Sequence, residues 1–204
     1  MAGGRRSRNI GAGAATFRRV ECHSAVQPFF TIGHGTRSVE DLAALLKAND
    51  VACLVDVRTV PRSRTNPQFN KDAMPAALEP HAIGYRHVAA LGGLRGRSPG
   101  VPPEVNALWE NDSFHNYADY ATTPAFRAGL DELLAMGRDV RCAVMCAETV
   151  WWRCHRRIIT DYLLACGESV FHIVGGDVPE PAKMTPGAVA EVNQALGGQL
   201  VRAA

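Results

Sequence analysis

Short apolar runs alternate with helix-periodic segments along most of this chain. The runs predict five strands, which lie at 29–32, 51–57, 83–88, 140–145 and 170–174. Between them, the spacing of apolar side chains predicts helices at 39–49, 71–78, 126–136 and 158–166. Ser38 is a suitable N-cap for the first helix, with Asp41 three residues further on. Gly137 and Gly167 follow the last two helices, where glycine commonly ends a helix.

Strands that alternate with helices indicate a parallel sheet with helices on both faces. We therefore expect an α/β fold with an open, mostly parallel five-stranded sheet, formed by a single domain over 28–204. The segment 91–120 shows no clear period and predicts a long functional or mobile loop. Residues 176–187 contain three prolines and predict a surface excursion before a last short helix.

Residues 1–27 differ from the rest of the chain. They hold five arginines among many Gly and Ala residues and show little periodic hydrophobicity. This composition favours a disordered basic arm, or the product of an early start codon, over a transit peptide. The segment has no apolar region of the secretory kind, and no run approaches the ~20 apolar residues of a membrane span. A cytoplasmic protein is the expectation, and the sequence does not indicate its oligomeric state.

The net charge of +2 is too small for a general nucleic-acid coat, so any anion binding must come from local clustering. Arginines gather on one segment, as Arg58, Arg62 and Arg64, and guanidinium groups match phosphate oxygens. We interpret this segment as phosphate-binding, although a solvated basic loop has the same composition. The predicted partner is a phosphate-bearing small molecule or a nucleic acid.

Polar groups follow the first two predicted strands. The turn from Gly33 to Thr36 can present backbone N–H groups and the side chains of His34 and Thr36 to an anion. Asp56 interrupts an apolar strand, and a buried carboxylate is either paired or functional. Strand alternation places Asp56 and Arg58 on the same side, so an Asp56–Arg58 pair and a functional role are equally compatible with the pattern.

The densest chemistry lies at 146–157, between the fourth predicted strand and the next helix. It includes Cys146, Glu148, Cys154, His155 and Arg156. In an open α/β sheet, the loop after a strand opens onto the ligand crevice. Three chemistries fit these residue types: a zinc site on the two cysteines and His155, a nucleophilic thiol, or acid–base catalysis by Glu148 and His155. Trp151 and Trp152 either stack on a base or cap the core.

The six cysteines are expected to be free thiols, because the chain is large and carries no export signal. The spacing of Cys146 and Cys154 does not match a zinc knuckle, so no metal or cofactor is assigned. We expect one activated thiolate beside an inert partner. Cys154 is the candidate for the low pKa, since it adjoins Arg153, Arg156 and a helix N-terminus. Cys146 directly follows an apolar strand, where burial raises a thiol pKa.

Eight motifs, taken together and in order, resemble the DUF488 family. They lie at 32–38, 54–58, 61–70, 85–87, 91–93, 117–120, 145–148 and 154–156. The resemblance implies a compact intracellular α/β domain whose motifs form one site. It implies no reaction and no catalytic assignment.

The functional expectation is therefore an enzyme acting on a phosphate-bearing substrate, a nucleotide or nucleic acid, in a crevice at the carboxyl ends of the strands. The substrate-binding candidates are His34, Thr36, Arg58, Arg62, Arg64 and Arg156, and the catalytic candidates are Asp56, Cys146, Glu148, Cys154 and His155. The alternatives are a non-catalytic nucleic-acid-binding module, and a metal or redox module built on Cys146, Cys154 and His155.

Overall fold

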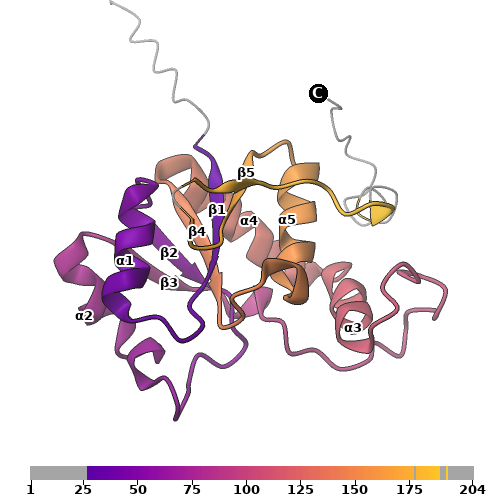
Figure 1. The fold of residues 1–204 in the computed structure, drawn as a ribbon. Coiled ribbons are helices and arrows are strands. Elements are labelled where there is room, and N and C mark those ends of the chain that lie inside the picture. The colour runs from indigo at the N-terminus through magenta and orange to yellow at the C-terminus, as the bar shows by residue number, and fades with distance from the viewer. Residues whose placement is uncertain (1–26, 177, 189–191, 193–204) are drawn as a thin grey trace, which may run out of the picture.

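A six-stranded sheet forms the centre of the molecule in a computed structural model that describes residues 27–176, 178–188 and 192. The strands are β1 (Phe29–Gly33), β2 (Cys53–Asp56), β3 (Gly84–His87), β4 (Cys142–Cys146), β5 (Val170–Ile173) and β6 (Glu180–Pro181). Their order across the sheet is β3-β2-β4-β1-β5-β6, and Figure 1 labels the first five strands of the chain. The expected α/β class and mostly parallel sheet are confirmed. The predicted arm and most of the predicted last helix lie outside the described residues.

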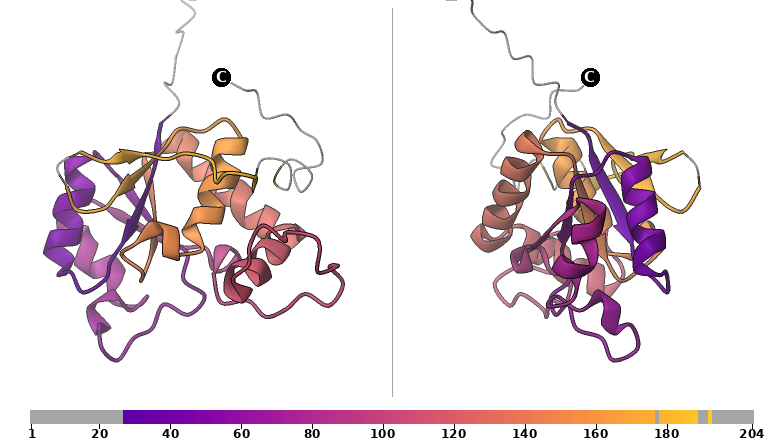
Figure 2. Two further views of the ribbon diagram at one scale, coloured as in Figure 1. Left: turned by 45° about the vertical axis from the view of Figure 1, so that its right-hand side comes forward. Right: turned by 90° about the vertical axis from the view of Figure 1, so that its left-hand side faces the viewer.

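Two layers of helices cover the sheet (Figure 2). The helices are α1 (Val39–Ala48), α2 (Met74–Leu78), α3 (Asp112–Ala121), α4 (Pro124–Asp139) and α5 (Arg156–Ala165). One core joins α1 and α2 to the side chains of Ile32, Leu54 and Met145. The other joins α3, α4 and α5 to Val55 and Val144. Successive side chains of a strand point to opposite faces, so neighbouring residues of one strand enter different cores.

The expected cap of α1 is present, because the Ser38 side chain accepts a hydrogen bond from the Asp41 backbone N–H. The helix predicted at 126–136 is longer than expected and runs through Gly137 instead of ending there. A Cβ atom at Gly137 would lie 2.0 Å from Cζ of Phe29. This glycine therefore provides room for a buried ring inside a helix, and it is not a helix terminator.

Two further elements were missed by the sequence reasoning. Helix α3 lies inside the segment interpreted as a long loop, and Asn111 caps it by accepting from the Ser113 and Phe114 backbone N–H groups. Strand β6 pairs antiparallel with β5, so the sheet has six strands where five were expected. It has only two residues, one of them a proline, and sits at the sheet edge, where proline is tolerated. No helix among the described residues has the length and apolarity needed to cross a membrane.

Two ionisable side chains are buried in the layers around β5 and α5. His172 on β5 is 1% exposed, hydrogen-bonds Thr31 on β1, and stacks on Trp151. Burial, reinforced by the positive charge of Arg156, lowers the pKa of His172 to about 4. Burial also raises the pKa of Asp161 in α5 to about 6. Both residues are thus held in their neutral forms over part of the acidic range.

These two groups make opposite contributions to acid stability. Between pH 6.5 and 4, an unfolded His172 binds a proton that the folded residue does not bind, so the fold loses stability as the pH falls. Folded Asp161 binds its proton at higher pH than the unfolded residue, so its contribution increases as the pH falls through about 6.

We predict that His172→Asn removes about 2 kcal/mol of the stability loss between pH 7.5 and pH 5, given about 1.4 kcal/mol per pKa unit. We predict that Asp161→Asn makes the loss larger by about 1 kcal/mol, because it removes the opposing contribution. Urea unfolding of each variant and the wild type at both pH values measures this. Identical pH dependence in all three proteins would show that neither buried group is linked to folding.

Candidate functional site

The carboxyl ends of β1, β2 and β4 meet at one edge of the sheet. In the parallel register, Gly33 lies opposite Cys146 and Asp56 lies opposite Met145. The pairing continues past β1, where the His34 and Gly35 backbone N–H groups donate to the carbonyls of Cys146 and Ala147 at 3.0 Å each. A Cβ atom at Gly33 would lie 2.0 Å from the carbonyl oxygen of Glu148, so only glycine permits this close approach. The loops after the three strands are therefore held against one another.

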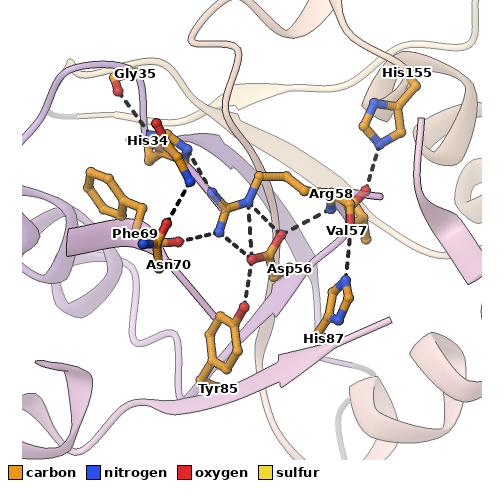
Figure 3. Close-up of polar contacts among 11 residues, drawn as sticks. His34, Gly35, Asp56, Val57, Arg58, Phe69, Asn70, Tyr85, His87 and His155 are labelled. Carbon is orange, nitrogen blue, oxygen red and sulfur yellow. Dashed lines mark hydrogen bonds and ion pairs between the residues drawn. The ribbon is translucent and has the colours of Figure 1, made fainter. Parts of the chain in front are cut away.

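The first polar cluster surrounds Asp56 (Figure 3). The Asp56 side chain is 0% exposed. The Arg58 guanidinium donates from Nε to Oδ1 at 2.9 Å and from Nη2 to Oδ2 at 2.5 Å. Tyr85 on β3 donates its hydroxyl to Oδ2 at 2.6 Å. Burial and hydrogen bonding to Asp56 raise the pKa of Tyr85. Asp56 thus has the paired role that was one of its two interpretations.

Arg58 also links this cluster to β1 and to the loop before α2. Its Nη2 donates to the Phe69 carbonyl at 2.6 Å, and its Nη1 lies 3.2 Å from His34 Nε2. Because a guanidinium only donates, His34 Nε2 accepts and its proton sits on Nδ1, which donates to the Gly35 carbonyl at 2.9 Å. Burial lowers the pKa of His34, and the ring stacks on Phe69 with centroids 4.2 Å apart.

These contacts give no support to the expectations that Asp56 handles protons and that Arg58 binds phosphate, and both stay predictions. All three guanidinium nitrogens of Arg58 already donate to acceptors within the protein. Desolvation of a charge is costly unless the charge is paired, and this pair satisfies both partners. The pair holds the chain that follows β2. Two histidines hydrogen-bond the backbone there: His87 contacts the Arg58 carbonyl at 2.9 Å, and His155 contacts the Val57 carbonyl at 3.0 Å (Figure 3).

The second cluster contains two thiols on the opposite side of the sheet. Cys146 ends β4, and a 3₁₀ turn at Trp151–Arg153 brings the chain back so that Cys154 Sγ lies 2.7 Å from Cys146 Sγ. Both cysteines are free and buried. Nδ1 of His155 and Nε of Arg156 each lie 3.4 Å from Cys154 Sγ. One sulfur atom is therefore contacted by a thiol, an imidazole and a guanidinium.

The hydrogen-bond partners of neutral His155 determine its tautomer. Its Nε2 contacts the Val57 carbonyl, which can only accept, so Nε2 carries the proton. The lone pair of Nδ1 then faces Cys154 Sγ and can accept the thiol proton. Arg156 is buried and also donates to the Glu148 carbonyl, so its guanidinium is held beside the sulfur.

The pKa values of the two thiols are shifted in opposite directions. Burial raises the pKa of Cys146, and its contact with Cys154 raises it further. Burial opposes ionisation of Cys154 too, but hydrogen bonds from Cys146 and His155 and the charges of His155 and Arg156 hold the pKa of Cys154 well below its usual value. The arrangement stabilises one thiolate, on Cys154, with Cys146 as its S–H donor.

Gly93 and Tyr117, both distant from His155 in the sequence, pack against its imidazole. A Cβ atom at Gly93 would lie 2.3 Å from His155 Nδ1, and the Tyr117 ring meets the imidazole edge-on at 5.0 Å. Tyr117 donates to the Leu91 carbonyl at 2.8 Å, which ties α3 to this segment. The motifs at 91–93 and 117–120 did not predict this contact with His155. These motifs consist mainly of a glycine pair and two tyrosines, and such residues do not indicate in the sequence that they contact His155.

A pocket of about 430 Å³ opens over the thiol cluster. Five candidate residues line it: Arg58, Cys146, Glu148, Cys154 and His155. Arg153, Leu94 and Phe114 also line it and were not proposed from the sequence. Glu148 is exposed at the wall of this pocket.

The other candidates lie elsewhere, outside the described lining of this pocket. Asp56, His34 and Arg156 are buried behind it, and Thr36 and Arg64 are exposed. Arg62 lines an adjoining pocket of about 410 Å³ together with Asn70 and Lys71, and Val60 lines both pockets. The structure thus separates the expected single crevice into a thiol pocket and a basic pocket that share one wall residue.

The ligand atoms of Cys146, Cys154 and His155 lie within 4.8 Å of one another, so these residues are a candidate metal site. The sulfurs, however, are 2.7 Å apart. Two thiolates on tetrahedral zinc lie roughly 3.8 Å apart, because each Zn–S bond is about 2.3 Å. Zinc would therefore require the sulfurs to separate, and it would place a dication beside the buried guanidinium of Arg156.

The fold and this edge of the sheet define an α/β domain with two thiols, a histidine and an arginine in contact at the carboxyl ends of its strands. The family model described as "Domain of unknown function DUF488" matches residues 38–163, and the chain belongs to this family. No match was found among curated proteins or among solved structures. The family match begins at the N-cap of α1 and ends within α5, so it includes Asp56, Arg58 and both thiols but not His34.

We predict that Arg58→Ala destabilises the fold by about 3–5 kcal/mol, because it leaves the Asp56 carboxylate buried without its partner. The exposed Arg62 provides the matched control, and Arg62→Ala should change the free energy of unfolding by less than about 0.5 kcal/mol. Urea denaturation of both variants measures the difference. Equal stabilities would contradict the structural role of the Asp56–Arg58 pair.

Proposed function

We propose that the protein is an enzyme that acts on a phosphate-bearing substrate, with the Cys154 thiolate as its nucleophile. The observation that carries the proposal is the contact of Cys154 Sγ with His155 Nδ1 and Arg156 Nε at the wall of the thiol pocket. A nucleophile beside a base that is itself oriented by a third group is the usual arrangement for covalent catalysis. Here the third group is the Val57 carbonyl.

The steps follow from the positions of these groups. His155 Nδ1 accepts the thiol proton, and the thiolate attacks the electrophilic centre of the substrate. Arg156 stabilises the thiolate before attack, and His155 returns the proton to the leaving group. Glu148, exposed at the pocket wall, supplies a carboxylate that can activate water to release the product from Cys154.

Phosphate recognition is assigned to arginines and a lysine that the fold leaves available. Arg153 is exposed on the wall of the thiol pocket, and Arg62 and Lys71 are exposed on the basic pocket. Because Val60 lines both pockets, an extended substrate such as a nucleotide can reach Cys154 with one end and the basic pocket with the other. A guanidinium binds phosphate through charge-assisted hydrogen bonds.

The thiolate is tested by displacing His155. Gly93→Ala introduces a Cβ atom into the imidazole, which should move Nδ1 away from Cys154 and raise the pKa of that thiol. Gly96→Ala is the matched control, because a Cβ atom there meets nothing within 4 Å. Alkylation rates measured against pH should shift to higher pH in Gly93→Ala alone.

Two results would refute the nucleophile assignment. The first is a Cys154 thiol in the wild type that reacts no faster near neutral pH than an unperturbed thiol of pKa about 8.5. The second is a set of pH profiles that coincide for the wild type and both glycine variants.

Phosphate binding is tested by thermal shift against a set of nucleotides and short nucleic acids, because a ligand of the native state raises the melting temperature. We predict that Arg62→Ala and Arg153→Ala each weaken binding of the best ligand by about 1–3 kcal/mol. The exposed Arg138 on α4 lines neither pocket, so Arg138→Ala should bind as the wild type does. If the double variant Arg62→Ala/Arg153→Ala bound the ligand as tightly as the wild type, the proposal that these arginines bind phosphate would be wrong.

A further inference from the structure

The reaction proposed above leaves Cys146 without a chemical step of its own, although this thiol lies 2.7 Å from the nucleophile. We propose that Cys146 and Cys154 form a reversible disulfide when a hydroperoxide enters the thiol pocket, with Cys154 reacting first and Cys146 resolving. The proposal shares with the proposed function only the reactive Cys154 thiolate, and it requires no phosphate-bearing substrate.

The sulfur positions favour this bond. A disulfide needs sulfurs about 2.05 Å apart, so the pair has to close by less than ~1 Å. The connection between the two cysteines is a loop and a 3₁₀ turn, and Ala147, Glu148, Trp152 and Arg153 in it are exposed. Closing the sulfurs is also a smaller displacement than the separation that zinc requires.

The surroundings of the pair decide which sulfur reacts first. Peroxides oxidise accessible thiolates, and the Cys154 thiolate is the one stabilised at the pocket wall. The other described cysteines can be compared with Cys154. Cys166 is exposed, but the described contacts place no cationic side chain within hydrogen-bond reach of its sulfur. Cys53 and Cys142 are buried register partners in the sheet and are absent from the described lining of both pockets.

The first step forms a Cys154 S–O bond and breaks the O–O bond of the hydroperoxide. The departing alkoxide, or hydroxide from hydrogen peroxide, takes the proton that His155 received from the thiol. Cys154 is then a sulfenic acid. Two electrons have passed from sulfur to the peroxide.

The second step uses Cys146. Its sulfur attacks the Cys154 sulfur, the S–S bond forms, the S–O bond breaks, and the released hydroxide combines with the Cys146 proton as water. Burial is the main cause of the raised pKa of Cys146, and oxidation of Cys154 prepares this step by removing the negative charge that raises this pKa further. Arg156, which favours the Cys146 thiolate, stays in place. An external dithiol reverses the disulfide by thiol–disulfide exchange.

The experiment treats the fully reduced, full-length protein with one equivalent of hydrogen peroxide and maps the products by peptide mass spectrometry. The wild type should lose two thiols and show a Cys146–Cys154 disulfide that dithiothreitol removes. Cys146→Ser should stop at a Cys154 sulfenic acid, trapped by dimedone. Cys154→Ser should slow peroxide consumption at least tenfold, and Cys166→Ser should leave it unchanged.

The outcomes separate this inference from the proposed function. A reactive Cys154 that never pairs with Cys146, or a disulfide found at Cys53 and Cys142 instead, would overturn the resolving role and leave the nucleophile intact. Stoichiometric zinc that protects the pair from peroxide would overturn the disulfide and favour the metal site. A Cys146–Cys154 disulfide in a protein that binds no phosphate ligand would support this inference and count against the proposed function.

Discussion

The buried ion pair between Asp56 and Arg58 is the interaction on which this edge of the molecule depends. Arg58 contacts three separate segments through one guanidinium: the carboxylate at the end of β2, the imidazole after β1, and the Phe69 carbonyl before α2. Its position fixes the chain at Val57, whose carbonyl sets the tautomer of His155. Through Val57, the pair thereby helps to determine which nitrogen of His155 faces the Cys154 thiol. Breaking it is costly because a charge would stay buried.

The site is consequently divided between two faces of one sheet. On one side, carboxylate, guanidinium, phenol and imidazole satisfy one another and leave little capacity for a ligand. On the other side, the Cys154 thiol meets His155 and Arg156 beside an open pocket. The first cluster supports the chain, and the second holds the thiol that we propose as the nucleophile. Catalytic groups held by a rigid support of this kind keep their geometry through the reaction.

Much of this arrangement could be predicted from the sequence, because the strands are short apolar runs and the polar residues follow their ends. The parallel topology and the placement of Asp56, Cys146 and His155 at one edge follow from that pattern. The contacts of the ion pair could not be predicted, since the Phe69 carbonyl meets Arg58 and the Tyr85 hydroxyl meets Asp56 only through the fold. Helix α3 was missed because 91–120 shows no long apolar period, although Phe114, Tyr117 and Ala121 carry a weak helical one. The contact between Gly93 and His155 spans distant segments and has no local signal.

The central claim is that the fold stabilises one thiolate, on Cys154, and suppresses ionisation of its neighbour Cys146. The most direct measurement is a pH titration of thiolate ultraviolet absorbance in the wild type, Cys154→Ser and Cys146→Ser. The account predicts an ionisation well below the ordinary thiol pKa of about 8.5 that is present in the wild type and absent in Cys154→Ser. A wild-type curve without that ionisation, or one that Cys154→Ser leaves unchanged, would contradict the account.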